Sequence, residues 1–310
     1  MKNIIELFDM LDDPNVTGET VAQFLRERGA ADVRVKTVTG EKGSTDFVRV
    51  FIAGKNGKSS GGTAPTLGII GRLGGIGARP ERIGFTSDGD GALAALSIAA
   101  KLATMASRGD VLEGDVIVIT HVCPHAPTRP HDPVPFMDSP ITSAMCNGEE
   151  VEEAMDALLS IDTTKGNRIV NARGIAITPT VKEGYILRIS EDLLNLLETT
   201  TGRLPVVLPI THQDITPYGN TLYHLNSIMQ PSVATTAPCV GLAITTESQV
   251  AGCATGATHV ADVDEAVRFS IEVAKAYTHG ACHFYDAAEY KRIEALYGSL
   301  SHFRTFGRNA

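Results

Sequence analysis

A short acidic turn between an apolar segment and a long helix constrains the fold of this chain more than any other segment. The turn is Ser87-Asp-Gly-Asp-Gly91, and the residues around it predict a short strand over 82–86 and a helix over 92–107. Backbone amides at a helix N-terminus lack partners and carry partial positive charge, so carboxylates and anions are stabilised there. Asp88 and Asp90 therefore either cap the helix or serve as ligand or catalytic carboxylates, and one residue can do both.

Apolar segments typical of buried strands alternate with amphipathic helical segments over the rest of the chain. The expected strands lie at 33–39, 46–52, 65–71, 115–120, 168–171, 174–181, 204–210 and 240–244. The expected helices lie at 3–12, 17–29, 92–107, within 139–160, at 190–199 and at 262–279. This alternation predicts the α/β class, as a three-layer α/β/α sandwich with a mixed, mostly parallel sheet. No repeat, linker or composition shift divides the chain, so we expect a single domain over 1–310, with residues 1–30 as a helical segment packed on the core.

The composition excludes several classes of partner. Hydrophobic residues make up 43% and charged residues 20% of the chain, as in soluble proteins with a sizeable core. With a net charge of −9, 5% aromatic residues and no Trp, the chain lacks the basic runs and stacking platforms that nucleic acid binding needs. We expect no membrane partner, because no apolar run approaches membrane-spanning length and no signal-peptide pattern is present. Five scattered cysteines without an export signal indicate reduced thiols and a cytoplasmic protein.

A loop rich in proline and histidine follows the apolar segment 115–120. It places His121, Cys123 and His125 close together in sequence, with His131 and Asp132 a few residues further on. Imidazole, thiolate and carboxylate groups are ligands for zinc and related ions, and loops at strand ends are favoured positions for sites. The spacing matches no zinc-finger pattern. The alternative is a surface loop whose histidines make ordinary hydrogen bonds.

Two further histidine segments are candidate sites. His212 and Asp214 alternate after an apolar segment, so they could share one side of an extended chain, with the carboxylate orienting the imidazole. The alternative is a turn in which Asp214 binds backbone amides. His279 and His283 have the i, i+4 spacing of some helical zinc ligands, although cations at a helix C-terminus need no metal to explain them.

A glycine-rich segment follows the predicted strand 65–71, but it is not a dinucleotide-binding loop. Such a loop must open a helix, and Pro80 follows here instead. Arg72 at the strand end could bind the carboxylate or phosphate of a substrate. The alternative is a salt bridge with a neighbouring acid.

The order of these segments resembles the co-catalytic zinc aminopeptidases, the glutamyl and deblocking aminopeptidase group, over roughly residues 45–275. Residues 65–75 are similar to that family's strand ending in His-x-Asp, and 87–91 to its turn with the bridging Asp. Residues 114–120 are similar to the strand before its Glu-Glu pair, and 257–267 to the start of its final helix. The whole chain is similar to an uncharacterised prokaryotic family, domain of unknown function 1177. The resemblance to the aminopeptidases implies an α/β/α fold and a metal-assisted hydrolase.

Most of the aminopeptidase metal ligands have no counterpart in this chain. Arg72 and Gly74 stand where that family has its His and Asp, and Cys123-Pro124 stands where it has its two glutamates. The late ligand His has no counterpart near Thr255, and only Asp88 carries over. The usual two-zinc site therefore cannot be built from these residues.

Together these features predict a hydrolase of small peptide-like or amide substrates with an atypical site. It would use one divalent metal, zinc or manganese, or no cofactor. The predicted metal ligands are Asp88, His121, Cys123, His212 and Asp214. His125 or Asp90 would carry the proton, and Arg72 would take a substrate carboxylate. The alternative functions are a non-catalytic descendant that binds a small metabolite or a protein partner, and a structural subunit; in each case we expect a homo-oligomer.

Overall fold

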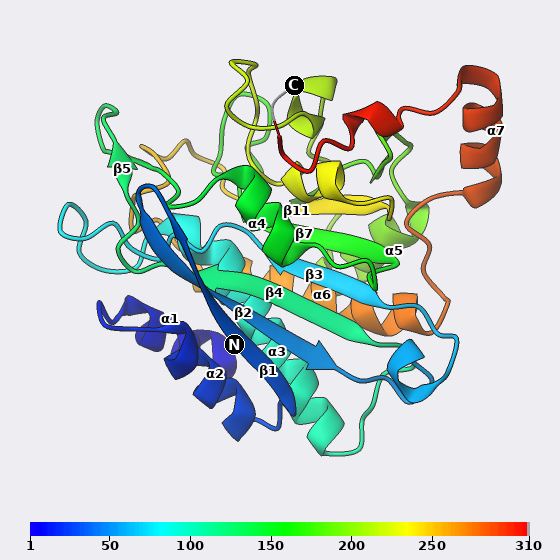
Figure 1. Ribbon diagram of the computed structural model, residues 1–310, viewed down its shortest axis with the longest axis horizontal. Helices are drawn as coiled ribbons and strands as arrows, with labels where there is room; N and C mark the ends of the chain where they lie inside the picture. The colour runs from blue at the N-terminus through cyan, green and yellow to red at the C-terminus, as the bar shows by residue number, and fades with distance from the viewer. Residues whose placement is uncertain (309–310) are drawn as a thin grey trace.

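The computed structural model describes residues 1–308, and its centre is a nine-stranded mixed sheet (Figure 1). The strand order is β1-β2-β4-β3-β7-β11-β9-β10, with β8 also paired to β11. The strands are β1 (Asp32–Gly40), β2 (Gly43–Ile52), β3 (Leu67–Gly71), β4 (Val116–Val122), β7 (Ala157–Thr163), β8 (Gly174–Ile177), β9 (Val181–Lys182), β10 (Tyr185–Ile186) and β11 (Cys239–Thr245). The short strands β5 (Thr128–Arg129) and β6 (Phe136–Met137) form a separate hairpin.

The four central strands run parallel, and the outer strands pair antiparallel. β3 lies between β4 and β7, and β7 pairs with β11 on its other side. These strands are buried almost throughout and are nearly continuous in apolar residues, as expected where both faces of a sheet are covered. Because they are parallel, their carboxyl ends meet at one edge, which we call the carboxyl edge.

Helices cover both faces of the sheet. One face carries α1 (Lys2–Asp12), α2 (Gly18–Glu27), α3 (Asp90–Ser107), α5 (Glu191–Thr201) and α6 (Val260–Thr278), which share the larger hydrophobic core. The other face carries α4 (Ser143–Glu150) and the 3₁₀ helices η3 (His212–Ile215) and η4 (Gln230–Ala234), over a second core. The remaining helices are η1 (Lys58–Ser60), η2 (Ser87–Gly89), α7 (Ala287–Tyr297) and η5 (Ser301–Phe303). The predicted α/β/α sandwich is confirmed.

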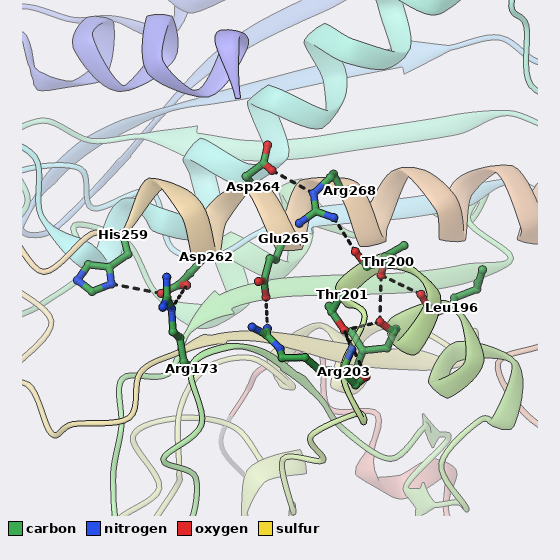
Figure 2. A network of polar contacts seen from close by, with 11 residues as sticks. Arg173, Leu196, Thr200, Thr201, Arg203, His259, Asp262, Asp264, Glu265 and Arg268 are labelled. Carbon is green, nitrogen blue, oxygen red and sulfur yellow. Dashed lines mark hydrogen bonds and ion pairs between the residues drawn. The ribbon is translucent and has the colours of Figure 1, made fainter.

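Ion pairs fix the start of α6 against its neighbours (Figure 2). Arg203, which follows α5, pairs with Glu265 at 2.5 Å, and Arg268 pairs with Asp264 at 3.0 Å. Arg268 also donates to the carbonyl oxygen of Thr200 in α5. These contacts hold α5 and α6 side by side in one layer.

Four secondary-structure predictions are wrong, and a physical reason is evident for two of them. The helix predicted within 139–160 ends at Glu150, and the apolar residues after Asp156 form β7, because a continuous apolar run fits a buried strand as well as a helix. Residues 204–210 contain two prolines, which cannot donate to a strand ladder, and form only one bridge, between Ile177 and Val207. Residues 82–86 and 168–171 are loops.

Within residues 1–308, no helix has both the length and the apolar composition required to cross a membrane.

Candidate functional site

Buried polar side chains gather at the carboxyl edge, on the α4 face of the sheet. Ile70 of β3 and Ile119 of β4 belong to the core beneath α4. Because side chains alternate along a strand, Arg72 and His121, each two residues further on, lie on the same face. Asp162 lies at the matching position of β7, two residues after Ser160. Arg72, His121 and Asp162 are all buried.

Arg72 pairs with Glu150 of α4 in the interior of the protein. Their side chains are 2% and 0% exposed, and Nε of Arg72 lies 3.4 Å from Oε2 of Glu150. Burial raises the pKa of Glu150 to about 7, against the lowering effect of the Arg72 charge. The pair is imperfect, because Nε and Nη1 of Arg72 and both carboxylate oxygens of Glu150 lack a hydrogen-bond partner. Arg72 therefore has the salt-bridge role that the sequence left open, and it is sealed from solvent.

His121 is a neutral imidazole whose two nitrogens are both engaged. The backbone N–H of Gly74 donates to Nε2 at 2.9 Å, so Nδ1 carries the proton and donates to the hydroxyl oxygen of Thr45 at 2.8 Å. Burial, together with the charge of Arg72, lowers the pKa of His121 to about 3. Gly74 is required here, because a Cβ would come within 1.8 Å of the carbonyl oxygen of His121.

His121, Cys146 and Glu150 form a group that could hold a metal ion. Their ligand atoms all lie within 4.8 Å of one another, and in the part of the chain that the structure describes no other set of three such residues does so. We call this group the triad. The guanidinium of Arg72 is paired with Glu150 of this triad, and its charge opposes the rise in the pKa of the Cys146 thiol. Burial and the Glu150 charge raise the pKa of Cys146 to about 12, so it is a thiol at neutral pH.

Asp88 and Asp162 are a second acidic group at the same edge. Asp88 lies in η2, and its carboxylate fits against Gly75, where a Cβ would come within 2.6 Å of Oδ2. Burial and the charge of Asp162 raise the pKa of Asp88 to about 8, against a hydrogen bond from the Cys253 thiol. Burial likewise raises the pKa of Asp162 to about 7, although a hydrogen bond from the Ser227 hydroxyl and the charge of Arg72 lower it.

Neither of these carboxylates forms an ion pair with any residue among 1–308. The partners of Asp162 are the hydroxyl of Ser227 and the backbone N–H of Thr163, the latter at 2.7 Å from Oδ1. Buried carboxylates without a cationic partner are costly unless they are protonated or bind a cation. Each of these two carboxyl groups is therefore a position where a proton or a cation is stabilised.

Asp90 has the opposite surroundings, although it is only two residues from Asp88. Its carboxylate accepts from Nζ of Lys165 at 2.7 Å and from the hydroxyls of Thr163 and Thr258 at 3.0 and 2.6 Å. The ion pair is buried, with side chains 8% and 0% exposed. Asp90 joins α3 to the loops after β7 and before α6, and its side chain caps no helix.

The other predicted site residues lie in different surroundings. The Cys123 thiol is buried against the carbonyl oxygen of Ser44, and burial raises its pKa to about 11. His125 and His212 are both exposed, and His212 stacks on Phe303. Asp214 accepts hydrogen bonds from the backbone N–H groups of Thr211 and Leu225. Asp214 thus has the turn role that was its alternative. His279 and His283 do not share a helix face, because α6 ends at Thr278.

Sequence reasoning missed three residues of the edge. Asp162 lies at the end of an apolar segment, as Arg72 and His121 do. If residues 157–163 are recognised as a strand, this position marks Asp162 as a candidate site residue. Cys146 and Glu150 have i, i+4 spacing on α4, which places them on one helix face. No local sequence feature marks that helix face as the one that contacts Arg72. Arg72 follows β3 and Glu150 ends α4, so the two residues are far apart in the sequence.

Two surface hollows, of about 460 and 470 Å³, lie away from this edge. The first is lined by residues 187–192, His283 and residues 285–290. The second is lined by residues that precede β7 and β11, together with Lys182, Tyr277 and residues of the segment 282–287. Neither hollow is lined by a residue of the triad or by Asp88 or Asp162.

The α/β/α sandwich with a polar carboxyl edge is the architecture that the resemblance to the zinc aminopeptidases implied. The sequence matches the family described as "Protein of unknown function (DUF1177)" over residues 36–307, and the chain belongs to that family. Among solved structures it is similar to the "Bottromycin maturation enzyme BotP", with a TM-score of 0.52 and 14% identity, over 90% of this chain and 70% of that chain. At this identity the likeness concerns the fold alone. No curated protein matches the sequence.

Proposed function

We propose that the protein is a hydrolase of small peptide-like or amide substrates, with Asp88 and Asp162 as its reacting centre. The observation that carries the proposal is that these two buried carboxylates lie at the carboxyl edge of parallel strands without an ion-pair partner in residues 1–308. Perturbed acids at such an edge are typical of active sites. The peptidase-like fold supports the class of reaction by analogy.

The balance of charge at the edge supports a cation at this centre. The buried charged side chains here are those of Arg72, Asp88, Asp90, Glu150, Asp162 and Lys165. Arg72 pairs with Glu150 and Lys165 pairs with Asp90, so Asp88 and Asp162 have no ion-pair partner of their own. A divalent cation or the protonated amine of a peptide-like substrate would take the place of the protons that these two acids hold near neutral pH.

The residues present fit a divalent cation. Carboxylate oxygens are the ligands that manganese and magnesium prefer, and zinc also accepts them together with sulfur. Asp88 and Asp162 would hold the ion, with the Cys253 thiol beside Asp88. When bound, such an ion supplies a Lewis acid and a water of lowered pKa.

The chain itself orients this centre. The hydroxyl of Ser227 and the backbone N–H of Thr163 each donate to a different oxygen of Asp162 and fix its carboxylate plane. Gly75 lets the carboxylate of Asp88 approach closely. Asp88 and Asp162 bind protons near neutral pH, so a cation that binds between them displaces a proton.

Hydrolysis of a panel of dipeptides and acyl amides, with added manganese or zinc, tests the proposal. We expect turnover by the wild type and a loss of at least about 100-fold in Asp88→Asn and Asp162→Asn. Asp110→Asn, an exposed carboxylate outside the site, is the matched control and should keep full activity. Full activity in Asp162→Asn, or no turnover by the wild type with any ion, contradicts the proposal.

A second candidate function is non-catalytic binding of a small metabolite or protein partner. The observation that favours it is that Arg72 occupies the interior beside the triad and is closed to solvent, so no substrate carboxylate reaches it. Under this alternative, a bound ligand is retained without turnover and its affinity is the same in the presence of a chelator. Ligand affinity that falls when a chelator is added supports the metal-assisted hydrolase instead.

A further inference from the structure

We propose that the guanidinium of Arg72 acts as the built-in cation of a latent metal site formed by His121, Cys146 and Glu150. In the wild type this positive charge takes the place of a metal ion in the triad. An uncharged side chain at position 72 would open the site to zinc. The inference concerns a different group of residues from the Asp88–Asp162 centre and does not depend on it.

The triad has the composition of a zinc site. It offers an imidazole nitrogen, a thiol sulfur and a carboxylate oxygen, which are the three ligand types that zinc accepts in proteins. These atoms lie within 4.8 Å of one another, and the three residues are 2%, 2% and 0% exposed. The ligands come from β4 and from successive turns of α4, both rigid elements.

Arg72 interacts with the triad mainly through its positive charge and less through well-formed hydrogen bonds. Its Nε lies 3.4 Å from the Glu150 carboxylate, and the charge of the guanidinium also acts on the Cys146 thiol. Two of its nitrogens and both Glu150 oxygens nevertheless lack hydrogen-bond partners. A side chain selected only for a structural salt bridge would satisfy these atoms in bidentate form, as Arg and carboxylate usually do. The arrangement is that of a cation placed among ligands.

The charge of Arg72 also explains why the wild type should exclude a metal from the triad. A divalent ion bound there would lie close to the guanidinium, in an interior where like charges repel strongly. Both nitrogens of His121 are held by Thr45 and Gly74, so the imidazole must give up one hydrogen bond to bind an ion. Without Arg72, the carboxylate of Glu150 has no cationic partner. We therefore expect that binding an ion compensates for the hydrogen bond that His121 loses.

Ion uptake by position 72 variants tests the inference. Wild type, Arg72→Met, Arg72→Ala and Arg72→Lys are incubated with Zn²⁺, freed of excess ion and analysed for zinc content. Parallel samples receive Co²⁺, whose absorption reports a bound thiolate. We expect Arg72→Met and Arg72→Ala to bind one more ion per chain than the wild type, with a cobalt–thiolate signal. Arg72→Lys keeps the charge and should bind no extra ion.

Two controls assign the extra ion. Adding Cys146→Ala to Arg72→Met should abolish both the extra ion and the cobalt–thiolate signal. Arg49→Met removes another partly buried Arg–Glu pair on the sheet, with Glu152, and should bind no extra ion. Loss of the Arg72 charge also changes the surroundings of Asp162, so an extra ion that survives Cys146→Ala is assigned to Asp88 and Asp162 and counts against the inference.

Each outcome decides the inference. If the neutral variants fold and take up no extra ion, or if the wild type shows a Cys146-dependent cobalt signal, the inference is wrong. If the neutral variants do not fold without metal, the inference predicts that Zn²⁺ restores their native circular dichroism. Failure of zinc to do so in both variants also overturns it.

Discussion

Asp88 and Asp90 stand two residues apart at the start of α3, yet one is unpaired and the other is fully satisfied. Asp90 receives three donors, one of them the ammonium group of Lys165. The sequence identified both acids, with Asp88 predicted as a metal ligand and Asp90 as a proton carrier, but it did not reveal that Asp90 is ion-paired. Local pattern places carboxylates at a helix start, whereas the ammonium group that pairs with Asp90 lies 75 residues further along the chain.

The buried ion pair between Lys165 and Asp90 gives a prediction at the residue scale. Lys165→Met leaves the Asp90 carboxylate buried without its cation, so we expect it to lower the free energy of unfolding by about 3–5 kcal/mol. Urea denaturation measures the change. Lys275→Met removes an exposed pair with Glu272, in which both side chains are 43% exposed, and should cost no more than about 0.5 kcal/mol.

The double variant Lys165→Met with Asp90→Asn separates charge from packing. It should recover part of the lost stability, because no unpaired charge remains at position 90. Equal losses for Lys165→Met and Lys275→Met would show that the buried pair contributes no more than a surface pair.

At the scale of elements, the sequence predicted the parts whose pattern is local and long. The helix over α3 and the strands β3, β4 and β11 lie within a few residues of their predicted bounds. β7 was assigned to a helix, and Asp162 was lost with it. The triad was missed for a similar reason, since the face of α4 that meets Arg72 is chosen by tertiary packing. The sequence predicts that polar side chains lie at the carboxyl edge. It does not predict which side chains these are, because contacts between residues distant in sequence determine them.

Two helical glycines give opposite predictions for the same substitution. In α3, a Cβ on Gly91 would come within 1.9 Å of the carbonyl oxygen of Arg72 and 2.7 Å of that of Ile161. Gly91→Ala should therefore separate α3 from the carboxyl edge and cost about 3 kcal/mol or more. In α4, Gly148 is exposed and has nothing within 4 Å of the added Cβ. Gly148→Ala should stabilise the protein by about 0.5–1 kcal/mol.

Thermal unfolding of the two alanine variants beside the wild type checks this pair of predictions. A lower midpoint for Gly91→Ala and a higher one for Gly148→Ala are expected. Similar midpoints for both would mean that α3 can move away from β3 at little cost, and that the edge is not rigidly held.

At the scale of the whole molecule, the acids of the edge set how stability depends on pH. Burial raises the pKa of Asp88 to about 8 and those of Asp162 and Glu150 to about 7, from ordinary values of 3.8, 3.8 and 4.5. The folded protein therefore holds protons that the unfolded chain releases. Their stabilising contribution is present below about pH 4 and is lost as pH rises toward 8, at about 1.4 kcal/mol per unit for each proton.

Denaturation at pH 5 and pH 8 measures this dependence. We expect the acids of the edge to favour the folded state at pH 5, and the difference between the two pH values to shrink in Asp88→Asn and Asp162→Asn. A divalent ion that binds the same two carboxylates should shrink it in the wild type as well. A difference unchanged by either substitution would mean that Asp88 and Asp162 titrate normally.

The central claim is that Asp88 and Asp162 together bind a cation, and calorimetric titration with Mn²⁺ tests it most directly. Titrations at pH 7 in two buffers of different ionisation enthalpy report both the affinity and the protons released. The account predicts that the wild type and Asp110→Asn bind one ion at this centre with release of a proton, and that Asp88→Asn and Asp162→Asn lose that binding. Wild-type protein that binds no divalent ion, or binding that persists unchanged in both site variants, would contradict it.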